Sequence, residues 1–162
     1  MAWAKKEDKY GFIDQNAKIV IPFEYDWAGN FNNGLVHVRK GTQWGHIDTL
    51  GNVVTPFIYE STGEFNRGYA SVKREGKSGR VDTTGKEIIP CLYFGMRAFY
   101  EGLAVVVKNE NGIRKWGFVD ETGKEAIPCI YDGAEDFKNG KAKVKLNEKS
   151  FYIDKQGNII KE

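Results

Sequence analysis

Histidine, cysteine and proline are scarce in this chain of 162 residues, which has two histidines, two cysteines and four prolines. The sequence contains no pairs of cysteines at zinc-binding spacing, no glycine-rich phosphate motif and no nucleophile placed beside a base. We therefore expect no enzymatic activity, no metal and no cofactor.

Long apolar runs and excess charge are also missing. No run approaches the roughly 18 apolar residues that span a membrane, and the N-terminus lacks a signal-peptide core of about 7–15 apolar residues. The net charge is only +2, which gives no reason to expect a nucleic acid partner. We expect a soluble chain without a membrane span, cytoplasmic by default, with export open if a leader has been removed.

The two cysteines occupy a position that is aromatic in other parts of the sequence. Cys91 and Cys129 each follow a proline, and Phe23 and Phe57 follow the other two. A position that alternates between Phe and Cys is typical of the apolar interior. Neighbouring sheets lie about 10 Å apart, too far for a disulfide, so we predict two buried free thiols.

One short segment recurs along the chain: an aromatic residue, glycine, any residue, an aliphatic residue and aspartate. The spacings between its aspartates are 34, 34, 38 and 34 residues. A period in this range indicates a repeat protein. These aspartates are Asp14, Asp48, Asp82, Asp120 and Asp154.

Each copy contains three runs with the character of strands. The first alternates Ala or Val with other residues, the second holds the recurring segment, and the third is aliphatic and usually ends in proline. We predict an all-β chain of five three-stranded antiparallel meanders, at about 1–22, 35–56, 69–90, 103–128 and 141–162. A lone meander of this size is marginal in water, so the copies should stack into a single repeat domain over 1–162.

The turns and connectors also repeat. The aspartate of each recurring segment should open a type I turn that a glycine closes; Asp14 lacks that glycine, which predicts a looser turn. In the connectors, Asp26 and Asp132 resemble N-caps and predict one helical turn, with Ala28 and Phe31 facing inward together. The glycines that end the connectors suit a left-handed exit.

The two-residue loop Gly41-Thr42 predicts a type II′ hairpin turn that sets the strand register. This register places His37 directly opposite His46, and Arg39 and Lys5 opposite aromatic rings. Two facing imidazoles could hold a divalent metal. The same slots in other copies hold packing side chains, so we assign no metal there.

The last copy differs from the others in ways that bear on the assembly of the repeats. Phe151 replaces its glycine, and its first strand carries Lys141, Lys143 and Lys145. Terminal repeats of open arrays need a polar outer face, and lysines protect sheet edges. We therefore predict an open, solenoid-like array, with a closed five-bladed propeller-like ring as the alternative.

These units resemble WG repeats, a family named for its Trp-Gly pair. Lys115–Lys124, Ile127-Pro128, Tyr131-Asp132 and the Phe137–Gly140 segment carry the resemblance most fully. Serine replaces the Trp in two copies and tyrosine in another. The resemblance implies a repeat module of the kind found widely in bacterial proteins, with a binding or scaffolding role and no catalytic residues to transfer.

We expect a non-catalytic module that mediates protein–protein interaction; the alternative is a carbohydrate- or cell-wall-binding module that uses exposed aromatics such as Trp44 and Trp116. The insertion at 109–114 lengthens one hairpin and marks its rim as a contact edge. Positions that vary between copies are free to specialise, so they form our candidate binding surface. They are His37, Ser71, Val105 and Lys143 on first strands, and His46, Arg80, Phe118 and Tyr152 on second strands.

Overall fold

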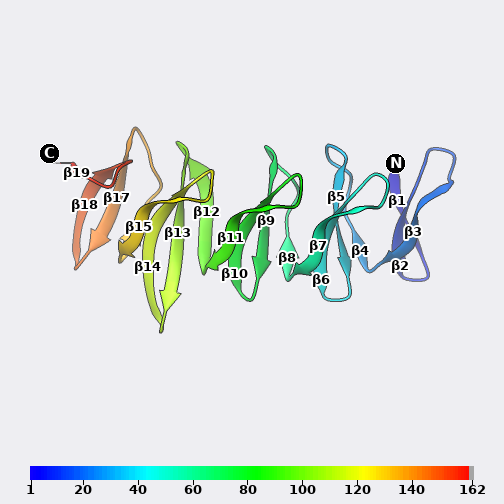
Figure 1. The fold of residues 1–162 in the computed structure, drawn as a ribbon, viewed down its shortest axis with the longest axis horizontal. Helices are drawn as coiled ribbons and strands as arrows, with labels where there is room; N and C mark the ends of the chain where they lie inside the picture. The colour runs from blue at the N-terminus through cyan, green and yellow to red at the C-terminus, as the bar shows by residue number, and fades with distance from the viewer. Residues whose placement is uncertain (161–162) are drawn as a thin grey trace. The chain divides into compact units, whose positions relative to one another are not determined.

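The structure is a computed structural model that describes residues 1–160. It is all-β: within these residues there is no helix, and the strands form five antiparallel sheets, none of which closes into a barrel (Figure 1). The chain divides into two compact units, Met1–Cys91 and Leu92–Glu162. The boundary falls inside a strand, directly after Cys91. Whether the repeats form an open array or a ring stays a prediction.

Unit 1 contains the first two sheets and the third sheet up to Cys91, and in each sheet neighbouring strands are consecutive in the chain. The first sheet has three strands, and the other two have four. The strands of the first sheet are β1 (Ala2–Lys6), β2 (Lys9–Ile13) and β3 (Ile19–Tyr25). The second contains β4 (Trp27–Ala28), β5 (Leu35–Lys40), β6 (Gln43–Asp48) and β7 (Val53–Tyr59). The third contains β8 (Ser61–Thr62), β9 (Tyr69–Arg74), β10 (Lys77–Asp82) and β11 (Glu87–Tyr93).

Unit 2 contains two four-stranded sheets of the same order. The fourth sheet has the longest hairpin of the five because it carries the insertion. Its strands are β12 (Gly95–Tyr100), β13 (Leu103–Glu110), β14 (Ile113–Asp120) and β15 (Glu125–Tyr131). The fifth contains β16 (Gly133–Ala134), β17 (Lys141–Leu146), β18 (Lys149–Asp154) and β19 (Ile159–Ile160).

The predicted hairpin register is confirmed. His37 pairs with His46 and Lys40 with Gln43, so the loop is Gly41-Thr42. Gly41 has φ +64°, as the first central position of a type II′ turn requires. The Arg39 guanidinium lies 5.8 Å from the Trp44 ring centroid, in agreement with the cation–aromatic pair expected from this register.

The predicted helical turn in the connectors is wrong, and so is the count of three strands in every sheet. Each connector instead pairs with the first strand of the next hairpin and adds a fourth strand to four of the sheets. Trp27 pairs with Arg39, and the Asp26 N–H donates to the Arg39 carbonyl at 2.8 Å. Extended pairing satisfies backbone groups at the edge of the first strand, which one helical turn would have left unpaired.

Asp26 therefore does not cap a helix, and its carboxylate bonds to the next hairpin and to the preceding sheet. Its Oδ2 accepts a hydrogen bond from the Gly41 N–H at 2.7 Å, across the turn of the next hairpin. Its Oδ1 binds Lys9 Nζ of the preceding sheet at 2.5 Å. Asp132 makes the equivalent bonds to Asn147 N and to Lys115. One carboxylate thus ties two successive copies together.

In the turn between the second and third strands, the aspartate accepts backbone N–H groups as predicted. The first copy, for which a looser turn was predicted, has the same turn. Asp120 Oδ1 accepts from the N–H groups of Thr122 and Lys124, at 2.9 and 3.0 Å. Asp14 makes the same two bonds, to the second and fourth residues after it. The looser turn expected there is wrong, because Ala17 adopts the left-handed conformation, with φ +59°, that glycine adopts elsewhere.

The glycine of the Trp-Gly pair lies under a bulge of the third strand. Trp116 pairs with Tyr131, whereas Phe118 pairs with Ile127, so β15 contains two more residues than β14 between the same two rungs. A Cβ on Gly117 would lie 2.6 Å from the Ile127 carbonyl oxygen. The proline segment therefore packs directly on the glycine backbone. In the last copy, where Phe151 replaces the glycine, Lys161 stands in place of the proline.

Aromatic contacts join successive sheets within each unit. A second-strand ring packs edge-on against the phenylalanine of the following connector: Phe12 with Phe31 at 4.8 Å in unit 1, and Phe118 with Phe137 at 4.9 Å in unit 2. His46 takes the same place against Phe65, at 4.5 Å. Large inward side chains thus lie between consecutive sheets, where the apolar core forms.

Candidate functional site

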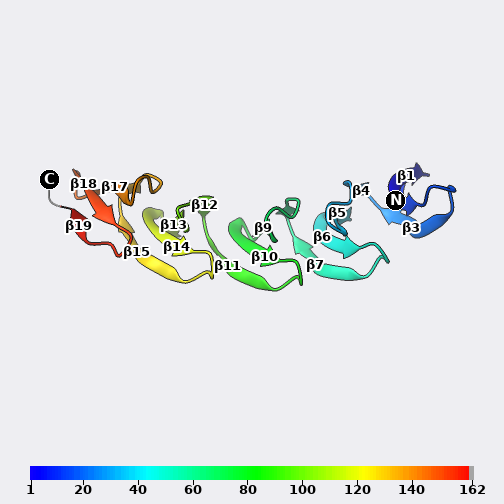
Figure 2. The ribbon, with the colours of Figure 1, turned by 90° about the horizontal axis from the view of Figure 1, so that it is seen from above.

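Third strands expose aliphatic side chains to solvent. Each lies at an edge of its sheet, and its residues alternate between the core and the outside. In β7, Thr55 and Tyr59 are buried, whereas Pro56 and Ile58 are exposed. Figure 2 shows β3, β7 and β11 along the same side of unit 1. We call these outward residues the aliphatic edge: Val20 and Pro22, Pro56 and Ile58, Pro90 and Leu92, Pro128 and Ile130.

The exposure of the aliphatic edge is large for side chains of this kind. Ile58 is 39% exposed, Leu92 55% and Ile130 47%. In three copies an exposed aliphatic residue lies two places after the proline, and in the first copy Val20 lies two places before it. Exposed apolar surface of this kind on soluble proteins often marks an interaction site. The sequence alone did not reveal this surface, because both faces of the third strands are apolar.

The same strands are poorly suited to pair with an added strand. Proline lacks the N–H that a ladder needs, and the bulge beside it interrupts the row of free backbone groups. Contact with a partner would therefore involve the side chains of the aliphatic edge rather than extension of the sheet.

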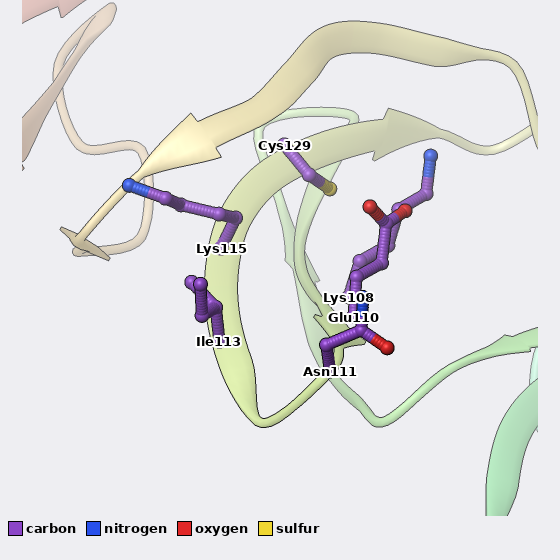
Figure 3. A pocket seen from close by; sticks show the side chains of 6 residues that line it. All are labelled: Lys108, Glu110, Asn111, Ile113, Lys115 and Cys129. Carbon is purple, nitrogen blue, oxygen red and sulfur yellow. The ribbon is translucent and has the colours of Figure 1, made fainter.

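Unit 2 also has a shallow cleft beneath the long β13–β14 hairpin (Figure 3). Its volume is about 310 Å³, at the lower end of the range for small-molecule sites. In Figure 3 the Cys129 side chain points toward Lys108 and Glu110, whereas Lys115 extends away from them. The lining residues are Lys108, Glu110, Asn111, Ile113, Lys115 and Cys129.

The polar groups of this cleft are mostly engaged. Lys108 pairs with Glu125 and Lys115 with Asp132, each at 2.5 Å. Burial, together with the charge of Glu125, raises the pKa of the Cys129 thiol to about 11. The thiol is therefore protonated near neutral pH and is a weak nucleophile. The cleft has a rim of mixed polar and apolar side chains, part of which belongs to the insertion at 109–114.

The structure separates the eight residues of the predicted binding surface into accessible and buried positions. The predicted pairs do face each other: Ser71 with Arg80, Val105 with Phe118 and Lys143 with Tyr152. Ser71 and Lys143 are exposed, and His37, Arg80 and Tyr152 are half-buried. His46, Val105 and Phe118 are at most 1% exposed, so a partner cannot reach them here. The binding role of the set stays a prediction.

The structure also shows where the cysteines, histidines and tryptophans considered in the sequence lie. Both cysteines are free; Cys91 is buried and Cys129 half-buried. The rings of His37 and His46 lie 6.3 Å apart, and residues 1–160 contain no group of three acidic, histidine or cysteine side chains placed to hold a metal. Trp44 and Trp116, whose exposure would have favoured a carbohydrate site, are half-buried. No helix in this range could cross a membrane.

Comparison with known protein families shows a match between this chain and one family. The model of the family described as "WG containing repeat" matches four segments, at residues 10–41, 44–77, 79–111 and 116–149. Together these segments span most of the chain, and each begins within the Trp-Gly pair or its equivalent. No curated protein matches the sequence.

Among solved structures, the chain is similar to one described as "Crystal structure of the eukaryotic initiation factor". The two share 13% sequence identity with a TM-score of 0.38. The match covers 99% of this chain and 61% of that one. A similarity at this level carries no argument about fold or function.

Proposed function

The chain belongs to the WG containing repeat family, and from that premise we propose that it is a non-catalytic scaffold module that binds another protein through its aliphatic edge. The observation that carries the proposal is the recurrence of exposed Pro-x-aliphatic positions on the third strands. Single exposed aliphatic residues are ordinary on proteins, but their repetition at one structural position in successive copies is not.

Two further features support a binding role over a catalytic one. The hairpin cleft contains no activated nucleophile, because the Cys129 thiol has a raised pKa. Its two lysines are paired with acidic side chains and are poorly placed to act as free bases. Repeat arrays commonly bind partners through equivalent positions of successive copies, and the aliphatic edge is built from such positions.

The proposal is tested by capturing partners on immobilised protein from a lysate of the source cell, with quantitative mass spectrometry. Ile58→Glu and Ile130→Glu place a charge on the aliphatic edge in unit 1 and unit 2. Leu50→Glu is the matched control, because Leu50 is 77% exposed in the turn between β6 and β7, outside the third strands. We expect one or more proteins to be retained by wild type and by Leu50→Glu, and to be lost with the edge variants.

A glycan array run beside the capture distinguishes the carbohydrate alternative. Glycan binding that persists in the edge variants, without any retained protein, would replace our proposal with that alternative. Equal loss of the captured protein in Leu50→Glu would show that the effect is not specific to the aliphatic edge.

A further inference from the structure

His46 occupies an inter-sheet position that is phenylalanine in two other copies. Its side chain is 0% exposed, between the second sheet and the connector that leads into the third, both within unit 1. Its Nε2 lies 2.9 Å from the Gly63 carbonyl oxygen, and its ring packs on Phe65. The equivalent contacts at Phe12–Phe31 and Phe118–Phe137 have no titratable group.

The hydrogen bond to Gly63 fixes the tautomer of the ring. A carbonyl oxygen can only accept, so Nε2 carries the proton and Nδ1 carries a lone pair. Nδ1 is buried and has no hydrogen-bond partner. Protonation would place both a charge and a second N–H donor at this atom, and burying either without a partner is strongly unfavourable.

The groups around the ring do little to compensate such a charge. His37 on β5 faces it, and a charge on His37 would repel one on His46. Thr55 on β7 is not titratable, and its hydroxyl is itself buried without a partner. From the connector side, Thr62 Oγ1 lies 3.5 Å from Nε2, and the charge of Glu64 acts on His37.

We propose that His46 is an acid-sensitive contact, whose protonation releases connector 61–68 from the second sheet and exposes Phe65. In the neutral form the ring holds the connector through the Gly63 bond and the Phe65 contact. In the charged form the ring leaves the gap to reach water, and both contacts are lost. The third sheet then loses its aromatic attachment to the second.

The direction of the pH effect follows from the burial of the ring. Burial lowers the pKa of His46 from 6.5 to about 4, so the open form takes up the proton more readily than the closed form. The contact contributes its full stability above pH 6.5 and loses it as the pH falls toward 4. For a ring that titrates at its ordinary value when open, the closed-to-open ratio falls about 20-fold between pH 7 and pH 5.

Hydrogen exchange at pH 7 and pH 5, corrected for intrinsic rates, tests the proposal directly. We expect protection of 61–68 to fall by about 20-fold at pH 5 in wild type, where exchange follows this opening. Connector 133–140, held by the Phe118–Phe137 pair, serves as the internal control without this change. His46→Phe copies those pairs and should abolish the pH dependence of 61–68.

A second measurement keeps the proposal testable if His46→Phe does not fold. Titration of the two histidines by NMR, assigned with a His37→Ser variant, should give a depressed pKa for His46. An ordinary pKa for His46 would overturn the proposal. It would also be overturned if connector 133–140 lost protection together with 61–68, or if 61–68 kept its pH dependence in His46→Phe.

Discussion

Ala17 shows how strongly a single aspartate can determine local conformation. At the equivalent turn position the other copies have glycine, with φ between +83° and +85°. Ala17 nevertheless adopts φ +59°, because Asp14 accepts the same two backbone N–H groups as its counterparts. The hydrogen bonds of the turn thus outweigh the steric preference of the alanine.

Replacement of Ala17 by glycine should stabilise unit 1. A left-handed alanine costs about 1–2 kcal/mol, part of which the extra freedom of glycine in the unfolded chain offsets. We expect the free energy of unfolding to rise by about 0.5–1 kcal/mol, measured by urea denaturation. The reverse change, Gly51→Ala at φ +85°, is the control and should destabilise. Stabilisation by both variants would contradict this account of the turn.

At the scale of the element, the third strand explains the Trp-Gly signature. Its proline segment bulges toward the second strand and rests on the glycine, so a side chain there has no room. Its outward residues form the aliphatic edge, and its inward residues fill the core. The third strand thus explains why the second strand needs glycine, and it also carries the proposed binding surface.

The Gly117→Ala variant tests this packing. The new Cβ would meet the Ile127 carbonyl oxygen at 2.6 Å and the Cys129 nitrogen at 2.7 Å, so backbone must move. We expect unit 2 to lose about 1–3 kcal/mol of stability, measured by chemical denaturation. Gly95→Ala is the matched control in the same unit, because its nearest neighbour is a Val107 methyl at 3.8 Å. Equal effects of the two variants would show that the bulge is not the reason for the glycine.

At the scale of the whole molecule, the local features were predictable and the pairings between copies were not. The turn at Asp120 and the facing of His37 and His46 depend on residues close in sequence, so hydrogen-bonding rules and loop length suffice. The strand at Trp27–Ala28 depends on pairing with Arg39 and Val38 of the next hairpin. From sequence, Asp26 resembles a helix cap, because its actual partner, the Gly41 N–H, lies 15 residues away.

The candidate site was harder to predict than the fold. Variation between copies suggested that His46, Val105 and Phe118 face a partner, but they lie in the core of their units. Such slots vary because each needs only to match the connector packed on it. The aliphatic edge escaped prediction because Val20 and Ile21 are equally apolar, and only the structure shows which of them points outward.

The most direct test of the proposed function is hydrogen exchange of the chain with and without a partner obtained by capture. We expect protection on binding at the third strands, over residues 19–24, 53–58 and 126–130, with connectors 27–34 and 133–140 unchanged. Protection confined to the connectors or to the first strands, with the third strands exchanging as in the free chain, would contradict a binding surface built on the aliphatic edge.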